Sequence, residues 1–333
     1  MRMLSTTGIA ALLPLLVSPI FAQQSPPSSP PSVLVYSATA GYRHDSIPTA
    51  IEALQELADR TSLYDPTFSE DPNLFTTEGL QGFKAIVFLS NSDQVLTSEG
   101  ESAFEDWLTT SGGSLVGLHA ATACLFNDTA FGTAMGSWFH RHPDIQNVTF
   151  TKLIDHETID MLPDRYDTYE EIYSFRTDPR AVNATVLLTV DPSSYVDSDK
   201  PTESGIDEPY FQGSPHPIAW FREGGMEVDL SNGTNAGEGK RMNGRMWMTS
   251  LGHTNETWRS DLHLQHVEAG LRWALADFSS SNSSNTPSSS QTTSSSTQSP
   301  TSSTPTNASN RIHDFATFLS SIFFAGFIIC ILS

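Results

Sequence analysis

The fold class is decided by the stretch Gly112-Gly113-Ser114-Leu115-Val116-Gly117-Leu118-His119-Ala120-Ala121-Thr122. A glycine pair precedes a short apolar run, which ends in a histidine flanked by small residues. This pattern is typical of a buried parallel strand that carries a polar group at its carboxyl end. Because ligands of open α/β sheets bind at that edge, His119 is the leading candidate for a functional residue. A core histidine bonded to a backbone carbonyl would fit the same pattern.

Strand and helix patterns alternate before this stretch. Val33–Tyr36 and Ala85–Leu89 are short apolar runs typical of strands. Ser46 is the expected N-cap of a helix after the first run, and Ser98 with Glu101 forms a capping box after the second. This alternation predicts an α/β fold with a mostly parallel central sheet covered by helices on both faces.

The pattern becomes less regular after His119. Ala120–Ala134 is expected to be helical, and Asp191–Tyr210 and Gly224–Gly239 are expected to be loops because of their proline, acidic or glycine content. Three apolar runs predict further strands, at Val148–Leu153, Val186–Val190 and Met246–Leu251. The amphipathic run Ser260–Asp277 predicts a helix that closes the domain.

Several histidines follow the predicted strands. His44 and Asp45 lie in the loop after the first strand, and His119 follows the third. His140 and His142 form a His-x-His pair, which would point the same way from an extended segment, an arrangement that metal sites use. Two surface histidines would show the same spacing, so the pair needs support from other residues.

Both ends of the chain carry targeting patterns. Residues 1–22 are typical of a secretory signal peptide, and residues 279–310 have the Ser/Thr-rich composition of a glycosylated stalk. Residues 311–333 end in an apolar tail with no basic residue after it, which predicts a GPI-attachment signal. A single carboxyl-terminal transmembrane helix is the alternative. We therefore expect a secreted protein anchored by GPI to the outer face of the plasma membrane.

The acidic composition of the chain excludes one class of binding partner. The chain has 17 basic and 38 acidic residues, a balance that argues against nucleic acid. Residues 32–278 are long enough for one α/β domain, and only Cys124 lies within them, so no disulfide is expected there. Seven N-x-Ser/Thr sequons agree with secretion: Asn127, Asn147, Asn183, Asn232, Asn255, Asn282 and Asn307.

Six motifs together resemble the ThuA-like (trehalose-utilisation) family. The resemblance runs from about Val33 to Ala276. The motifs, in chain order, are Ser37-Ala-Thr-Ala-Gly-Tyr-Arg-His-Asp-Ser-Ile-Pro48, Gly117-Leu-His-Ala-Ala-Thr122, Trp138-Phe-His-Arg-His-Pro143, Tyr169-Glu-Glu-Ile-Tyr-Ser-Phe175, His216-Pro-Ile-Ala-Trp220 and Gly244-Arg-Met-Trp-Met-Thr-Ser-Leu-Gly-His253.

The resemblance implies a flavodoxin-like α/β sandwich of the class I glutamine amidotransferase type. In amidotransferases the strand equivalent to Leu115–Leu118 ends in a cysteine nucleophile, whereas here that place holds His119. Cys124 follows five residues later among Ala, Leu and Phe, and is expected to be a small buried hydrophobe. Glutamine amidotransferase activity is therefore not expected.

One family motif differs here. The acidic-aromatic pattern Asp-Glu-Trp/Phe-Tyr is replaced by Glu170-Glu171-Ile172-Tyr173, so a stacking role for the third residue is in doubt. Adjacent strand residues point to opposite faces, so at most one of the two glutamates faces the site. We expect this to be Glu171, which matches the family's glutamate.

The resemblance and the residues together predict a metal-dependent hydrolase or lyase that acts on carbohydrate or a keto-sugar derivative. The cofactor expected is a divalent ion such as Zn²⁺ or Mn²⁺, with no nucleotide. The alternative is a non-catalytic carbohydrate-binding or cell-wall-associated module. The expected catalytic residues are His44, Asp45, His119 and Glu171; the candidate metal ligands are His140, His142 and His253; the expected substrate-binding residues are Tyr42, Arg43, His216 and Trp220.

Overall fold

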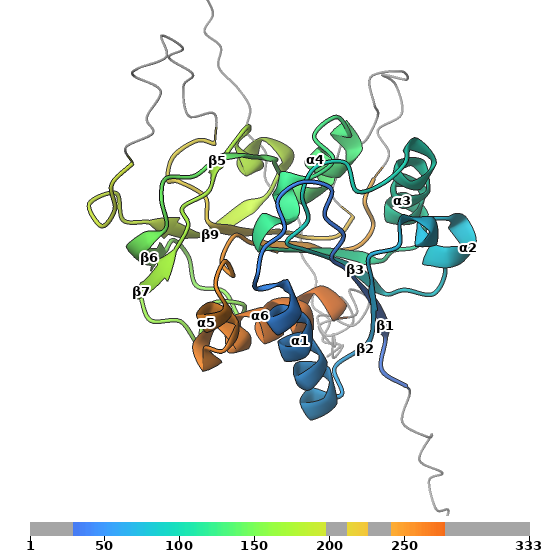
Figure 1. The fold of residues 1–333 in the computed structure, drawn as a ribbon, viewed down its shortest axis with the longest axis horizontal. Coiled ribbons are helices and arrows are strands. Elements are labelled where there is room, and N and C mark those ends of the chain that lie inside the picture. Colours follow the sequence, from blue (N-terminus) through green and yellow to red (C-terminus); the bar gives the residue numbers. More distant parts are fainter. Residues whose placement is uncertain (1–28, 198–211, 226–240, 277–333) are drawn as a thin grey trace, which may run out of the picture. The chain divides into compact units, whose positions relative to one another are not determined.

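A nine-stranded sheet forms the centre of the fold (Figure 1). The computed structural model describes residues 29–197, 212–225 and 241–276. The strand order is β2-β1-β3-β4-β11-β10-β9-β6-β7. The strands are β1 (Ser32–Tyr36), β2 (Asp65–Ser69), β3 (Ala85–Leu89), β4 (Ser114–Leu118), β6 (Gln146–Lys152), β7 (Arg165–Glu170), β9 (Thr185–Val190), β10 (Ala219–Arg222) and β11 (Met246–Thr249); a separate pair is formed by β5 (Phe139–Arg141) and β8 (Ser174–Phe175).

The sheet has a parallel part and a mixed part. Strands β2, β1, β3, β4 and β11 pair in parallel, and every pairing from β11 through β10, β9 and β6 to β7 is antiparallel. Of the nine strands in the described sheet, β10 and β6 therefore run against the other seven. The predicted α/β fold with a mostly parallel central sheet is confirmed.

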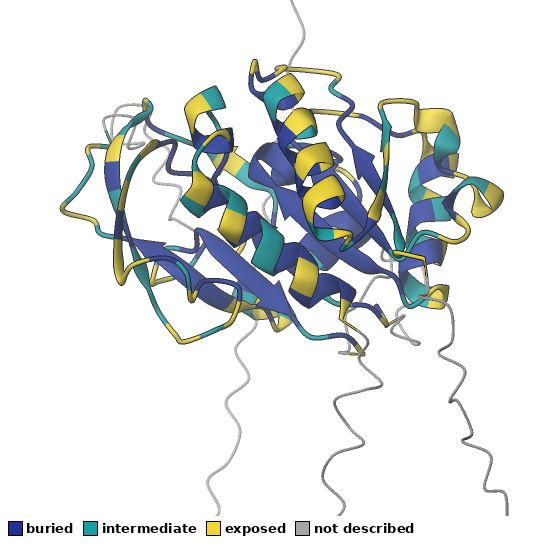
Figure 2. Cartoon of the chain, turned by 90° about the horizontal axis from the view of Figure 1, so that it is seen from below, coloured by how far each residue is buried: buried dark blue, intermediate teal, exposed yellow. Residues whose placement is uncertain are grey.

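Helices cover both faces of the sheet. Helices α1, α5 and α6 lie on one face and α2, α3 and α4 on the other (Figure 1). Seen from below, the helices on the near face carry their yellow exposed positions on the outward side, and the sheet behind them is coloured dark blue, as buried (Figure 2). The helices are α1 (Ile47–Thr61), α2 (Thr77–Leu80), α3 (Ser98–Thr110), α4 (Thr129–Met135), α5 (Asn255–Trp258) and α6 (Asp261–Leu275), with 3₁₀ turns η1 (Pro72–Leu74), η2 (His119–Ala123) and η3 (Pro179–Val182).

Strand β4 lies between β3 and β11 and is buried along its whole length. Successive side chains of a strand point to opposite faces. Leu115 accordingly packs in the core beneath α3 and α4, whereas Val116 and Leu118 pack in the core beneath α1 and α6. Both helical layers therefore hold β4 in place, and the residue that follows it is fixed at the carboxyl edge of the sheet.

Some local predictions need correction. The helix expected over Ala120–Ala134 is instead the short turn η2 and helix α4, which begins after Asp128 because its carboxylate accepts the Phe131 N–H at 3.0 Å. The N-cap of α3 is Thr97 rather than Ser98, since the Thr97 hydroxyl accepts the Gly100 N–H at 3.2 Å. Strands β2, β8 and β10 were not predicted, and β5 and β7 were indicated only as extended segments at the His-x-His pair and at the two glutamates.

Other predictions concern residues that are not described. The expected signal peptide, stalk and GPI-attachment segment lie outside the described residues, as do sequons Asn232, Asn282 and Asn307. Within the described ranges, no helix is both long and apolar enough to cross a membrane.

Candidate metal centre

His119 lies at a strained strand-to-helix turn. It directly follows β4 and begins η2, and its backbone has φ = 54°, in the left-handed region that residues with a Cβ seldom adopt. The opposing loop approaches closely at Gly252, where an added Cβ would lie 3.4 Å from the His119 Cβ. Gly252 itself has φ = 126°, which suits glycine alone. The turn thus fixes the direction of the His119 imidazole.

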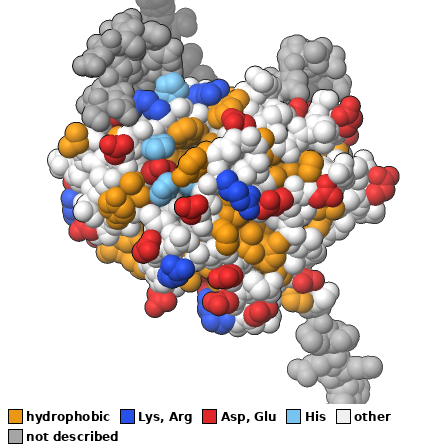
Figure 3. Space-filling model, in the orientation of Figure 1, with side chains coloured by type: hydrophobic (Ala, Val, Ile, Leu, Met, Phe, Trp, Pro, Cys, Tyr) orange, Lys and Arg blue, Asp and Glu red, His pale blue; other side chains and the backbone are white. Residues whose placement is uncertain are grey.

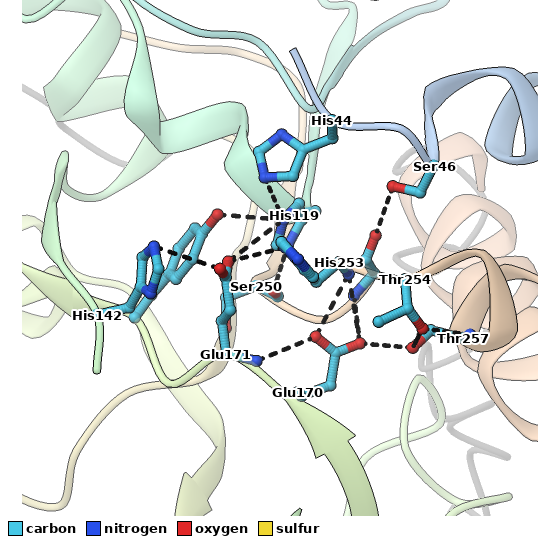
Figure 4. A network of polar contacts seen from close by, with 12 residues as sticks. His44, Ser46, His119, His142, Glu170, Glu171, Ser250, His253, Thr254 and Thr257 are labelled. Atoms are coloured by element: carbon cyan, nitrogen blue, oxygen red, sulfur yellow. Dashed lines mark hydrogen bonds and ion pairs between the residues drawn. The ribbon is translucent and has the colours of Figure 1, made fainter. Parts of the chain in front are cut away.

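Four loops bring four potential metal ligands together at the carboxyl edge of the sheet (Figure 4). His44 comes from the loop after β1, His119 follows β4, Glu171 follows β7 and His253 follows β11. One ligand atom from each residue lies within 4.8 Å of all the others. These four residues could hold a metal ion.

His119 presents one lone pair to this cluster. Its Nδ1 lies 2.9 Å from the Ser250 carbonyl oxygen, which can only accept, so Nδ1 carries the proton and Nε2 does not. The Nε2 atom faces His44 Nε2 at 3.0 Å and the Tyr173 hydroxyl at 3.1 Å. A carbonyl that orients a histidine through its second nitrogen is a common feature of metal sites.

Glu171 and His253 also face each other in a manner that suits a shared cation. Glu171 Oε2 lies 3.0 Å from His253 Nδ1 and 3.8 Å from His119 Nε2. Neither Glu171 Oε2 nor His253 Nδ1 has a hydrogen-bond partner of acceptable geometry among the described residues, although both atoms are buried. Buried polar atoms are nearly always satisfied, so an ion between them would supply the missing partner.

The distances fit a metal centre. Ligand atoms bound tetrahedrally at 2.0–2.1 Å from zinc lie about 3.3 Å from one another. Three contacts in the group, of 3.0, 3.0 and 3.8 Å, lie near that value, and the other pairs lie within 4.8 Å. Three imidazoles and one carboxylate are a donor set that Zn²⁺ accepts.

The charges suit ligation at His44, His119 and Glu171. Burial, with His44 beside it, holds the pKa of His119 well below its ordinary value, and burial with His253 nearby lowers the pKa of His44 to about 4. Both rings are therefore neutral near pH 7 and keep lone pairs. Although burial opposes ionisation, His253 and His142 hold the pKa of Glu171 below its ordinary value. Burial alone would lower the pKa of His253, but Glu171 raises it.

Glu170 supports the loop that carries His253. Its carboxylate is fully buried and accepts the Gly252 N–H at 3.0 Å, the His253 N–H at 3.3 Å and the Thr257 hydroxyl at 2.7 Å. Burial raises the pKa of Glu170, and these hydrogen bonds limit the rise. The two adjacent glutamates thus point apart, Glu171 into the cluster and Glu170 into the loop behind it (Figure 4).

A pocket of about 340 Å³ opens onto the cluster. Its wall includes His44, Glu171 and His253, together with Tyr42, whose side chain is 66% exposed. Figure 3 shows histidine side chains gathered on this view of the molecule, beside acidic and hydrophobic side chains. The remaining lining residues are Ser92, Ala120, Ala123, Phe139, His142 and Tyr173.

The two members of the His-x-His pair are separated. His142 is half-buried, lines the pocket and lies 3.3 Å from Glu171 Oε1 through its Nε2. His140 is exposed and lies outside the four-residue cluster. Strand β5 ends at Arg141, so the alternation that would place both rings on one side stops before His142.

Several expected site residues lie elsewhere. Arg43 pairs with Glu70 at 2.7 Å, and Asp45 is exposed, outside the pocket lining. His216 bonds the Tyr173 carbonyl at 2.7 Å and lines a different pocket, with Thr151 and Tyr195. Trp220 is completely buried, where its Nε1 donates to the Met135 carbonyl, so its ring cannot stack on a sugar.

Tyr173 and Ser250 were not among the expected site residues. Tyr173 stands two residues after Glu171, a spacing that in an extended segment places both side chains on one side. That spacing was a usable signal for Tyr173. Ser250 acts through its backbone carbonyl, which leaves no signature in the sequence.

Cys124 is buried, and its thiol donates to the Ala121 carbonyl at 3.4 Å. Burial raises the pKa of this thiol well above its ordinary value. A nucleophilic cysteine requires a lowered pKa and access to substrate, so Cys124 has the environment of a packing residue.

The described sequons differ in exposure. Asn127, Asn147 and Asn183 are exposed. Asn255 is half-buried and accepts the Thr49 hydroxyl at 2.5 Å, and the hydroxyl of its sequon threonine is bonded to Glu170.

Two solved structures that this chain resembles are ThuA-like proteins. A ThuA-like protein from Bacteroides uniformis has 19% identity and a TM-score of 0.54, with 76% of this chain and 94% of that chain covered. A ThuA-like protein from Parabacteroides merdae has 16% identity and a TM-score of 0.52, with 74% and 90% covered. A glutamine amidotransferase from Thermotoga maritima has 13% identity and a TM-score of 0.35, with 73% and 95% covered.

A sequence search of curated proteins gives no match. The family model of ThuA, described as trehalose utilisation, matches residues 32–274. This match begins with β1 and reaches the last turn of α6, so it includes the whole central sheet and all four residues of the cluster. The chain therefore belongs to the ThuA family.

Proposed function

We propose that this protein is a metal-dependent enzyme of the cell surface that acts on carbohydrate or a keto-sugar derivative. One observation carries the proposal: His44, His119, Glu171 and His253 converge at the carboxyl edge of the sheet with ligand atoms within 4.8 Å of one another. Two of the converging atoms, in Glu171 and His253, are buried without an acceptable hydrogen-bond partner among the described residues. Such a group in a pocket is a functional-site candidate.

The donor set favours Zn²⁺ or Mn²⁺ as the ion. Imidazole nitrogen suits zinc, and carboxylate oxygen suits both ions. When bound, the ion would polarise a substrate oxygen or activate a water molecule. These two roles are compatible with a hydrolase or a lyase.

The protein groups around the pocket would bind and orient the substrate. The exposed ring of Tyr42 and the ring of Phe139 border the opening and offer apolar surfaces to a sugar face. His142 reaches Glu171 from the open side, where it can hold or move a proton at the substrate. The family description, trehalose utilisation, supports carbohydrate as the substrate class.

Thiol chemistry has no support at this site. The residue after β4 is His119 in place of a cysteine nucleophile, and Cys124 is buried with a raised pKa. We therefore infer that the protein has no glutamine amidotransferase activity.

A cell-surface location rests on the sequence patterns at the two ends of the chain. Three exposed sequons, Asn127, Asn147 and Asn183, are compatible with passage through the secretory pathway. The GPI-attachment signal and the alternative transmembrane helix both lead to the outer surface of the cell.

The test is turnover by the full secreted protein on native and oxidised disaccharides, with Zn²⁺, with Mn²⁺ and with a chelator. We expect metal-dependent turnover that is lost in Glu171→Gln and retained in His140→Ala, a matched control on an exposed histidine. Absence of turnover under every condition would contradict the enzyme proposal. Sugar binding without turnover would instead identify a carbohydrate-binding module.

A further inference from the structure

The hydroxyl of Tyr173 occupies an unusual position in the cluster. It lies 3.1 Å from His119 Nε2, the same atom that faces His44 Nε2 at 3.0 Å. Because His119 Nδ1 carries the proton that the Ser250 carbonyl accepts, Nε2 has a single lone pair. The phenol and a metal ion therefore compete for that lone pair.

Packing holds the Tyr173 side chain in place when a metal ion replaces its hydroxyl at His119 Nε2. Its ring is fully buried against Phe139 at 4.6 Å and is stacked with His142 at 5.6 Å. Its backbone carbonyl is held by His216 Nε2 at 2.7 Å. The Glu171 carboxylate also lies beside the hydroxyl, and burial together with this carboxylate raises the pKa of Tyr173. Once His119 and Glu171 both ligate an ion, the hydroxyl remains beside the cluster and can turn to a further acceptor, because a buried donor without one costs about 1–3 kcal/mol.

The pocket supplies the place for that acceptor. Tyr173, Glu171 and His142 line the same pocket, which opens beside Tyr42. Because the Tyr173 hydroxyl lies 3.1 Å from His119 Nε2, a molecule that binds an ion held by His119, Glu171 and His253 would come close to that hydroxyl. A catalytic metal site keeps one position open for such a molecule.

We propose that Tyr173 donates a hydrogen bond to an oxygen atom of the ligand bound at the metal, and so makes the site selective for ligands that bind through an oxygen with a further lone pair. Carbonyl, carboxylate and hydroxyl oxygens satisfy this condition. A ligand whose donor atom has no remaining lone pair, such as an imidazole nitrogen, does not. The inference rests on the proposed metal centre, and Tyr173 is a ligand-binding residue that sequence reasoning did not identify.

Cobalt provides the test, because the visible absorption of protein-bound Co²⁺ changes when a ligand binds to it. The full secreted protein is loaded with Co²⁺ and titrated separately with acetate and with imidazole. We expect Tyr173→Phe to bind Co²⁺ at least as tightly as the wild type, since one competitor for His119 is removed. Its affinity for acetate should fall about 10-fold or more, the usual effect of losing a hydrogen bond to a charged group, whereas its affinity for imidazole should stay the same.

Tyr169→Phe is the matched control, since it removes the same hydroxyl from an exposed tyrosine that does not line this pocket. It should leave both affinities unchanged. Equal acetate affinity in Tyr173→Phe and the wild type would overturn the proposal while leaving the metal centre intact. Loss of Co²⁺ from Tyr173→Phe would also overturn it and would assign Tyr173 a purely structural role. A wild type that binds no Co²⁺ would overturn the metal centre together with this inference.

Discussion

Glu171 Oε2 and His253 Nδ1 lie 3.0 Å apart although they come from different parts of the sheet. Glu171 follows β7, at the antiparallel edge, and His253 follows β11, in the parallel part. Both atoms are buried and neither makes an acceptable hydrogen bond to another described group. The cluster therefore forms only when both parts of the sheet are assembled, and its four residues could then hold a metal ion.

Glu170→Gln should weaken the metal centre without touching the four ligands. The Gly252, His253 and Thr257 donors reach Oε1, and the Glu171 and His253 N–H groups reach Oε2, so an amide in either orientation turns its NH₂ group toward a backbone N–H that has lost its acceptor. We expect a loss of about 1–3 kcal/mol in the free energy of unfolding and a decrease of about 10–100-fold in Zn²⁺ affinity. Urea unfolding and calorimetric titration measure the two effects. The exposed Glu56→Gln should show neither, and wild-type values for Glu170→Gln would contradict this role.

Cys124→Ser should lower the stability of the protein and leave its activity unchanged. The thiol is buried and bonded only to the Ala121 carbonyl, so the more polar hydroxyl should lower the free energy of unfolding by about 1–3 kcal/mol. Turnover and metal content should stay at wild-type levels. A folded Cys124→Ser protein with metal but no turnover would show that the thiol takes part in the reaction.

Much of the parallel part of the fold could be predicted from sequence because its strands are short and wholly apolar. Ala85–Leu89 and Leu115–Leu118 are buried on both faces, and burial of that kind leaves an unbroken apolar run. Strand β2 contains Pro66 and lies at the edge of the sheet, where burial imposes no such pattern. Strand β7 alternates exposed residues with buried or half-buried ones and ends at Glu170, so it gives no strong apolar signal.

All four residues of the cluster were expected site residues, because each lies in one of the six family motifs. His119 and Glu171 stand directly after a strand, whereas His44 and His253 lie further along their loops. Trp220 belongs to a similar motif, but it lies within β10 and its side chain points into the core. His140 and His142 could not be distinguished by sequence because the end of β5 decides which ring reaches the pocket.

Acid should destabilise the protein partly through His263. This ring is buried, both its nitrogens have no hydrogen-bond partner among the described residues, and burial together with His266 lowers its pKa to about 3. Below the ordinary value of 6.5, the unfolded chain binds a proton that the folded protein does not, so stability falls as the pH falls through this range. Between pH 7.5 and pH 5 the loss from this residue should be about 2 kcal/mol.

His263→Phe should remove that part of the acid sensitivity. The phenyl ring keeps the edge-on contact with Trp258, whose ring centroid lies 4.9 Å away. Urea unfolding at several pH values should give a shallower dependence on pH for His263→Phe, and an unchanged one for His140→Phe at an exposed position. The same slope in His263→Phe as in the wild type would refute the assignment.

Anchoring can be tested on intact cells. If residues 311–333 direct GPI attachment, a phosphatidylinositol-specific phospholipase should release the protein into the medium. Protein that remains with the membrane after treatment, while a known GPI-anchored protein is released, would favour the transmembrane alternative.

Metal content tests the central claim most directly. The full secreted protein is equilibrated with Zn²⁺, dialysed and analysed for bound metal, alongside His253→Ala, Glu171→Gln and His140→Ala. We predict a single ion per chain in the wild type and in His140→Ala, and loss of that ion from His253→Ala and Glu171→Gln. A wild type without metal, or equal metal in all four proteins, would contradict the proposal that His44, His119, Glu171 and His253 form a metal centre.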